Sequence, residues 1–197
     1  MRKLLIVLLS LLTAVAAYPQ AESGDVPAVE PAPFERSSSQ QAVKVTSDVG
    51  AVVLPLTALS ASLISHDWQG AKQFALSAAT AAGVTLILKY SIHRRRPDGS
   101  DFHSMNSAHS AASFVSAAYI QRRYGWKFGI PAYALAAYVG WARIYSKKHD
   151  FWDVLAGAAI GVGSAYIYTR PFAQKHNLSI APVTDGRNFG FSAAFTF

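Results

Sequence analysis

The sequence predicts an all-α protein: a bundle of about five core helices, embedded in a membrane, with a short extended C-terminal tail. Hydrophobic residues make up 51% of the 197-residue chain, and its mean hydropathy of +0.19 is high for a soluble protein. Apolar segments almost free of charge recur along the chain, whereas the apolar–polar alternation of a strand occurs only near its end. There is no cysteine, which excludes disulfides and thiolate metal sites.

The first 17 residues are typical of a secretory signal peptide. Two basic residues precede an apolar run from Leu4 to Leu12, and small residues follow. The run is too short to cross a bilayer comfortably, so we expect cleavage, with an uncleaved anchor as the alternative. Residues 18–47 are rich in proline, acidic residues and serine, so they are expected to form a flexible linker outside the cytoplasm.

Residues 48–175 are expected to form the helical domain. Its apolar segments are rich in Ala, Gly and Ser, so helix backbones can approach closely, above all at Gly157 and Gly161. Each uncharged core is shorter than the ~20 residues that a crossing needs, although flanking side chains can extend it by snorkelling. A soluble bundle with the same helices as its core is the alternative. The five segments are Val49–Ile64, Phe74–Leu88, Ala111–Ile120, Ile130–Ala142 and Val154–Tyr168.

Residues 176–197 are expected to be the extended tail. Residues 178–183 and 188–197 look like extended backbone, and the second stretch alternates around aromatic residues. A terminal segment of this kind resembles the closing strand of an outer-membrane barrel, but it is too short to make a barrel. We therefore expect a short tail that packs on the bundle.

Three short polar clusters interrupt the apolar segments. The clusters are Lys89–Pro97, Asn106–His109 and Arg143–Asp153, which read K-x6-RP, N-S-A-H and R-x5-H-x3-D. Three cations around two histidines suit a tetrahedral oxyanion such as phosphate, because Lys and Arg donors can neutralise its oxygens together. One imidazole could attack phosphorus while the other protonates the leaving oxygen. The clusters therefore indicate phosphoryl transfer by a histidine nucleophile.

The three clusters resemble the motifs of the type 2 phosphatidic acid phosphatase (PAP2) and vanadium haloperoxidase superfamily, KxxxxxxRP, PSGH and SRxxxxxHxxxD. The resemblance covers roughly residues 49–170. Two departures stand out. Asn106-Ser107-Ala108-His109 replaces Pro-Ser-Gly-His, and Ala142 replaces the serine before the motif arginine. Ala108 in place of glycine could crowd the approach of phosphate to the backbone and weaken activity.

The resemblance implies a role for each matching side chain. His149 would be the nucleophile that forms a phosphohistidine, Asp153 would orient it, and His109 would be the general acid. The residues implied to bind the substrate phosphate are Lys89, Arg96, Ser107, Ala108 and Arg143.

Residue spacing adds structural expectations. Lys89 and Arg96 are about two helical turns apart, so both could project from one face at the end of the second helix. Arg94 and Arg95 are better explained as part of a solvated basic helix end. His149 and Asp153 stand at i and i+4, the spacing at which a carboxylate on the same helix fixes an imidazole tautomer.

Ser107 is expected to cap the helix that it begins, and the free amides of that helix end attract an anion. If each apolar segment crosses the bilayer once, all three clusters fall on one face. With a cleaved signal peptide that face is periplasmic, and basic residues of the other loops face the cytoplasm. Those basic residues are Arg122, Arg123, Lys127, Arg170 and Lys175.

The expected function is a metal-independent phosphatase that hydrolyses a phosphate monoester or pyrophosphate, most simply on a lipid, at the bacterial inner membrane. The alternatives are a soluble periplasmic acid phosphatase of the same superfamily and a non-catalytic lipid-phosphate binding protein. No cofactor is expected: a metal site of His103, His109 and His149 is conceivable, but the surrounding cations would repel a divalent ion.

The net charge of +7 does not indicate a nucleic-acid partner, because long apolar runs interrupt the basic residues. The sequence carries no signal for an oligomeric state.

Overall fold

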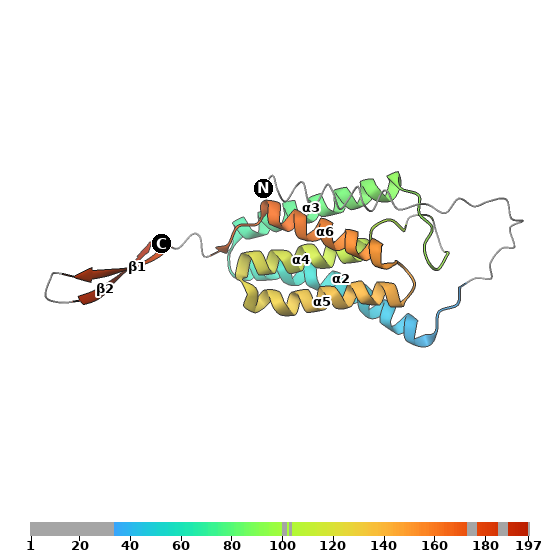
Figure 1. Ribbon diagram of the computed structural model, residues 1–197, viewed down its shortest axis with the longest axis horizontal. Coiled ribbons are helices and arrows are strands. Elements are labelled where there is room, and N and C mark those ends of the chain that lie inside the picture. Colours follow the sequence, from blue (N-terminus) through green and yellow to red (C-terminus); the bar gives the residue numbers. More distant parts are fainter. Residues whose placement is uncertain (1–33, 100–101, 103, 173–176, 185–188, 197) are drawn as a thin grey trace, which may run out of the picture.

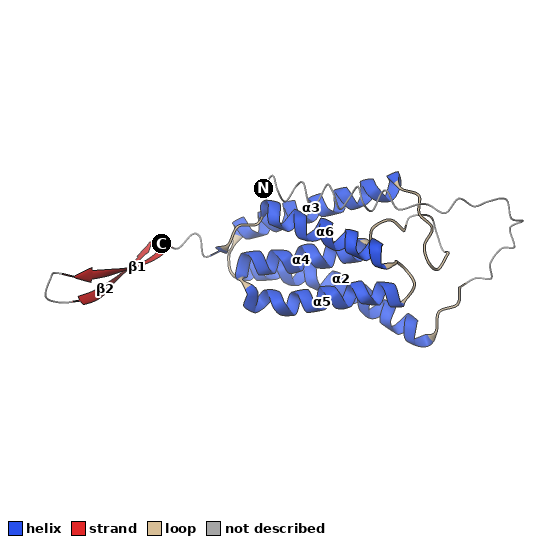
Figure 2. Cartoon of the chain, viewed as in Figure 1, coloured by secondary structure: helices blue, strands red, loops and turns tan. Residues whose placement is uncertain are grey.

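The computed structural model describes residues 34–99, 102, 104–172, 177–184 and 189–196. The expected signal peptide and most of the expected linker lie outside the described residues, as do His103 and Lys175. Within the described ranges the chain forms a bundle of five helices followed by two strands (Figures 1 and 2). The helices are α2 (Ser38–Ile64), α3 (Trp68–Ser91), α4 (Ala108–Tyr124), α5 (Trp126–Tyr145) and α6 (Phe151–Tyr168).

Helix α4 is the centre of the bundle. It packs against each of α2, α3, α5 and α6, and 11 of its 17 residues are buried. Because neighbours cover it on all sides, it carries a run of Ala and Ser rather than one apolar stripe. The five apolar segments of the sequence each lie in one helix, which confirms the predicted bundle.

Helices α4 and α6 approach each other closely at the two glycines that the sequence singled out. A Cβ atom on Gly157 would stand 2.5 Å from the Ser107 carbonyl oxygen, and one on Gly161 would stand 2.5 Å from the Ala111 carbonyl oxygen. Only a residue without a side chain fits at these points. This close approach also fixes the distance between the first turn of α4 and the first turn of α6.

Helix α2 begins at Ser38, so the predicted linker boundary at residue 47 is wrong. Ser37 is the N-cap, and its Oγ accepts a hydrogen bond from the Gln40 amide at 3.2 Å. The Gln40 side chain in turn accepts one from the Ser37 amide at 3.1 Å. The polar composition of this stretch suggested a linker, but it is a capping box that starts a helix.

Among the described residues, three helices are long and apolar enough to cross a membrane: α2, α3 and α6, with 27, 24 and 18 residues. Their large side chains face outward, since Val52 and Leu56 of α2 and Ile87 of α3 are 56–66% exposed. Ala58 and Ser77, which face inward, are fully buried. A soluble bundle shows the reverse distribution. The outward apolar surface therefore calls for a lipid environment and argues against the soluble alternative.

The two C-terminal strands form an antiparallel hairpin. β1 (Asn177–Thr184) pairs with β2 (Phe189–Thr196), with Asn177 opposite Thr196 and Thr184 opposite Phe189. The expected extended backbone is confirmed. Figure 1 shows the hairpin beyond the end of the bundle, so the expectation that this tail packs on the helices was wrong. Each strand pairs the backbone groups that face its partner, so the hairpin forms without a helix beside it.

Candidate active site

The three predicted clusters meet at one end of the bundle. The end of α3, the start of α4, the end of α5 and the start of α6 all lie there, together with the first turns of α2 (Figure 1). The Ser107 amide donates a hydrogen bond to the Asp153 carbonyl oxygen at 2.9 Å, which ties the second cluster to the third. The prediction that all clusters share one face is confirmed.

His149 lies in the turn between α5 and α6, before the N-cap residue Asp150, and not on the helix as expected. Its side chain is 2% exposed, and Nδ1 is 3.0 Å from the Ser104 carbonyl oxygen. A carbonyl oxygen only accepts, so Nδ1 donates and the neutral ring keeps a lone pair on Nε2. Burial lowers the pKa of His149, so the ring is neutral at pH 7.

Asp153 is fully buried, and its Oδ2 is 3.5 Å from His149 Nδ1. His149 Nδ1 is therefore farther from the Asp153 carboxylate than from the Ser104 carbonyl oxygen, and both oxygens lie near the same ring nitrogen. The Ser104 hydroxyl donates to Asp153 Oδ2 at 2.5 Å. Ser104 therefore contacts both members of the pair, a connection that no sequence spacing indicated.

Arg94 contacts Oδ1, the other oxygen of the Asp153 carboxylate. Its Nη1 is 3.4 Å from Asp153 Oδ1 and its Nη2 is 2.6 Å from Asp150 Oδ2. The loop after α3 folds back on itself, because the Arg94 amide donates to the Phe102 carbonyl and the Ser104 amide donates to the Arg94 carbonyl, both at 2.9 Å. The expectation of a solvated helix end was wrong for this residue.

Arg143 is buried at the end of α5 with 4% exposure. Its Nη1 donates to Asp48 Oδ1 at 2.7 Å and to Ser47 Oγ at 3.3 Å. Its Nε is buried and has no hydrogen-bond partner within the described part of the chain. A buried guanidinium N–H without a partner costs free energy unless a ligand accepts from it. An oxyanion in this position would supply that acceptor.

His109 is in the first turn of α4 and is one-third exposed. Its Nε2 is 2.9 Å from Asp48 Oδ1. Burial lowers the pKa of His109 to about 4, and the positive charge of Arg143 acts in the same direction while Asp48 opposes it. The shared contact with Asp48 Oδ1 places His109 beside Arg143, and the His149 amide donates a hydrogen bond to the Arg143 carbonyl oxygen at 3.3 Å, so the three residues lie close together, as a site for one anion requires.

Ser107 caps α4 as predicted: the Ser110 amide donates to its Oγ at 3.3 Å. The residue before it departs from the family motif in backbone conformation as well as in type. Asn106 has φ +47°, in the left-handed region that proline cannot adopt. Its side-chain amide is buried and hydrogen-bonds to the Thr85 hydroxyl at 3.0 Å.

Lys89 and Arg96 do not share a helix face, because α3 ends at Ser91 with an extended residue after it. Lys89 lies in the last turn of α3, at the same end of the bundle as the other clusters. Arg96 lies in the following loop. After burial and the charge of Arg143, the charge of Arg96 also lowers the pKa of His149, so Arg96 lies near the ring.

Helix α2 contributes to the site, which the three sequence clusters did not predict. Asp48 contacts both Arg143 and His109, yet it belongs to none of the three clusters. A signal was present: Lys44 and Asp48 are the only charged residues of a 27-residue apolar helix. Charged side chains in apolar membrane helices cost free energy and commonly belong to a functional site.

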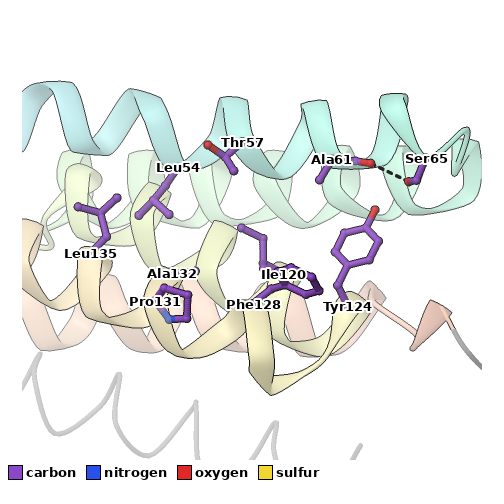
Figure 3. A pocket seen from close by; sticks show the side chains of 10 residues that line it. All are labelled: Leu54, Thr57, Ala61, Ser65, Ile120, Tyr124, Phe128, Pro131, Ala132 and Leu135. Atoms are coloured by element: carbon purple, nitrogen blue, oxygen red, sulfur yellow. Dashed lines mark hydrogen bonds between the residues drawn. The ribbon is translucent and has the colours of Figure 1, made fainter.

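Apolar cavities lie between the described helices, and two of them border α4. The larger, about 490 Å³, runs between α2, α4 and α5 and has no charged residue in its lining (Figure 3). The smaller, about 380 Å³, lies between α2, α3 and α4 and reaches Ala108, the neighbour of His109. The larger cavity therefore offers no charged group to a ligand, whereas the smaller one adjoins the cationic site. The lining of the larger cavity includes Leu54, Thr57, Ile120, Tyr124, Phe128 and Leu135.

Comparison with known proteins gives matches of three kinds. A family model described as the PAP2 superfamily matches residues 70–176. The chain is 26% identical over 156 residues to the lipid A 4′-phosphatase of Helicobacter pylori, and the aligned region covers 73% of this chain and 79% of that protein. It is 36% identical over 91 residues to the lipid A 1-phosphatase of Porphyromonas gingivalis, and the aligned region covers 45% of this chain and 20% of that protein.

Two crystal structures share the fold. LpxE of Aquifex aeolicus superposes with a TM-score of 0.59 at 19% identity, over 68% of this chain and 87% of that one. A transmembrane PAP2 type phosphatidylglycerolphosphate phosphatase from Bacillus subtilis gives 0.58 at 20% identity, over 84% and 92%.

Proposed function

Because the chain belongs to the PAP2 superfamily, we propose that it is a membrane phosphatase that removes a phosphate group from a lipid, through a covalent intermediate on His149. One observation carries the proposal most directly. A buried imidazole with its Nε2 lone pair available stands beside Arg143, whose buried Nε lacks an acceptor among the described residues. A nucleophile next to an unfilled anion position is the arrangement that phosphoryl transfer needs.

The proposed chemistry has two steps. His149 Nε2 attacks phosphorus, a P–N bond forms, and the P–O bond to the lipid breaks while His109 gives its proton to the leaving oxygen. Water then attacks the phosphohistidine, its proton returns to His109, and the P–N bond breaks to release phosphate. Binding of the phosphate dianion favours the protonated form of His109, which the unliganded site disfavours.

The other motif residues would stabilise the charge that develops on phosphorus. Arg143 would donate from Nε, Arg96 and Lys89 would add positive charge, and the first amides of α4 next to Ser107 would bind a phosphate oxygen. Asp153, held by Ser104 and Arg94, would keep the His149 ring in place.

A lipid is the favoured substrate for two reasons. The outward faces of α2 and α3 are apolar, so the site stands at the end of membrane helices, and an apolar cavity of about 380 Å³ starts beside it. Both curated relatives are named as lipid A phosphatases. Arg122 and Lys127 lie at the opposite end of the bundle, which supports a site that faces the periplasm. Protease treatment of intact spheroplasts tests this orientation, because the segment before α2 should be cut.

The deciding experiment measures phosphate release by the full-length protein in detergent micelles from a panel of lipid phosphates. The panel contains lipid A, phosphatidylglycerol phosphate, phosphatidate and undecaprenyl pyrophosphate. We expect turnover that survives EDTA, because the cations of the site are side chains, and that falls about 10³-fold or more in His149→Ala. Thr46→Val is the matched control on α2. Lipid binding without turnover would instead favour the non-catalytic alternative, which the Asn106 and Ala108 departures motivate.

A further inference from the structure

We infer that Asp48 of α2 is a positioning residue of this site: its carboxylate orients the Arg143 guanidinium and supports the proton on His109. The inference rests on the proposed function and adds to it a residue outside the three motifs. It makes α2 part of the catalytic apparatus and not only a helix that packs beside the site.

A single oxygen atom makes both contacts. Asp48 Oδ1 is 2.7 Å from Arg143 Nη1 and 2.9 Å from His109 Nε2. Asp48 Oδ2 is 3.0 Å from Lys44 Nζ one turn earlier, and the adjacent Ser47 hydroxyl accepts from the same Arg143 nitrogen. The carboxylate is therefore held on one side by its own helix and presents its other oxygen to the site.

The contact decides which edge of Arg143 meets a substrate. Nη1 is turned toward α2 by Asp48 and Ser47, so the Nε edge, which is buried without an acceptor in the described chain, remains for an anion. The guanidinium is planar and rigid, so fixing one nitrogen sets the direction of the others. Without Asp48 the same side chain could rotate away from the phosphate.

The contact also decides the charge state of His109. Around this ring stand Arg143 of α5 and His149 of the α5–α6 turn, while Lys89 of α3 lies at the same end and Asp153 of α6 faces His149. Burial and the nearby cations disfavour a proton on His109, and Asp48 is the carboxylate that acts against them. A general acid must hold its proton until the leaving oxygen needs it.

The position of Asp48 argues against a merely structural ion pair. The carboxylate is 38% exposed, so the fold does not need it to fill space. A negative charge next to a phosphate site also weakens substrate binding by repulsion, and a charge in an apolar membrane helix is costly. Both costs are understandable if the carboxylate supports catalysis.

The test compares Asp48→Asn with wild type in full-length protein. Histidine-labelled NMR titration, assigned with His109→Gln, should show the His109 midpoint lower by about one pH unit in Asp48→Asn. Turnover of a lipid phosphate should fall about 10- to 100-fold through kcat, as for other supporting partners of reactive groups. Turnover of an aryl phosphate, whose leaving group needs little protonation, should fall less than about threefold.

Controls separate the possible causes. Thr46→Val, two residues away on the same helix, should behave as wild type, and Asp48→Glu should recover part of the lipid phosphate turnover. Asp48→Ser serves if the asparagine variant fails to fold. An unshifted His109 midpoint, with equal losses on both substrates, would overturn the inference. A wild type without turnover would contradict the proposed function, and the NMR titration alone would then decide the role of Asp48.

Discussion

At the residue scale, Asn106 shows how a departure from a family motif changes the backbone. Its φ of +47° is open to Asn but closed to proline, whose ring holds φ near −65°. The buried amide also hydrogen-bonds to Thr85 of α3, a contact that proline cannot make. The residue before Ser107 therefore couples the cap of α4 to α3.

Restoring the family residue should harm this protein. We expect Asn106→Pro to cost about 3 kcal/mol or more of stability, because the ring is incompatible with the observed φ. Asn106→Gly keeps the left-handed conformation and should lose only about 1 kcal/mol, for the missing hydrogen bond. Unfolding in detergent measures both. Equal stability of the proline variant and wild type would show that the backbone here is not constrained.

The two site histidines predict a pH dependence of stability. The pKa of His109 is lowered by burial to about 4 from its ordinary 6.5, and burial also lowers the pKa of His149. Between pH 6.5 and about 4 the unfolded chain therefore binds more protons than the folded one. The contribution of the two neutral histidines to the free energy of unfolding should be fully present above pH 6.5, and stability should fall as the pH drops through this window.

Unfolding midpoints measured from pH 7.5 to 5 check this sign. A His109→Gln variant should show a flatter decline, because one of the groups that gain a proton on unfolding is gone. A midpoint that rises on acidification would contradict the assignment of neutral, buried rings.

The motif side chains could be predicted from sequence because their order and spacing match a known pattern. Asp48 and Ser104 could not. Asp48 precedes Arg143 by 95 residues, and it contacts His109 of α4 from a different helix. No local spacing in the sequence therefore indicates either contact. Ser104 acts partly through its backbone carbonyl, which any residue type carries.

At the scale of elements, the apolar segments predicted which helices exist but not where they end. Helix α2 starts earlier than its apolar core because Ser37 and Gln40 form a capping box. Helix α3 stops before Arg96 because the loop that follows folds back through Arg94. Ends are decided by caps and tertiary contacts, which weigh little in a hydropathy pattern.

The α4–α6 contact offers a test at this scale. Gly157→Ala would place a methyl group 2.5 Å from the Ser107 carbonyl, so α6 must move away from the first turn of α4. We expect lower stability by about 1–3 kcal/mol and lower turnover, because Ser107 and His149 lie on the two sides of this contact. Assays of phosphate release and unfolding measure the two effects.

Gly83 of α3 is the matched control, since a Cβ there meets no atom within 4 Å. Gly83→Ala should leave turnover unchanged and raise stability by about 0.5–1 kcal/mol, through the better helix propensity of alanine. Similar losses in both variants would show that the close approach of α4 and α6 does not support the site.

At the scale of the whole molecule, the placement of large and small side chains distinguishes a membrane bundle from a soluble one. Composition alone left both open, because each apolar core looked too short to cross. The helices proved longer than their cores, and side chains such as Val52 and Ile87 face outward while alanine and serine fill the interior. A cationic site with two neutral histidines then lies at one end of an apolar body, which suits a substrate with an anionic head and apolar chains.

The covalent step is the central claim, and a rapid-quench experiment tests it most directly. Wild type is mixed with a lipid substrate labelled in its phosphate group, quenched within milliseconds in alkali and searched for acid-labile phosphohistidine. We expect labelled protein in wild type, no label in His149→Ala, and label that forms slowly in His109→Ala with a lipid leaving group. Undiminished label in His149→Ala would show that the nucleophile lies elsewhere and would contradict the account.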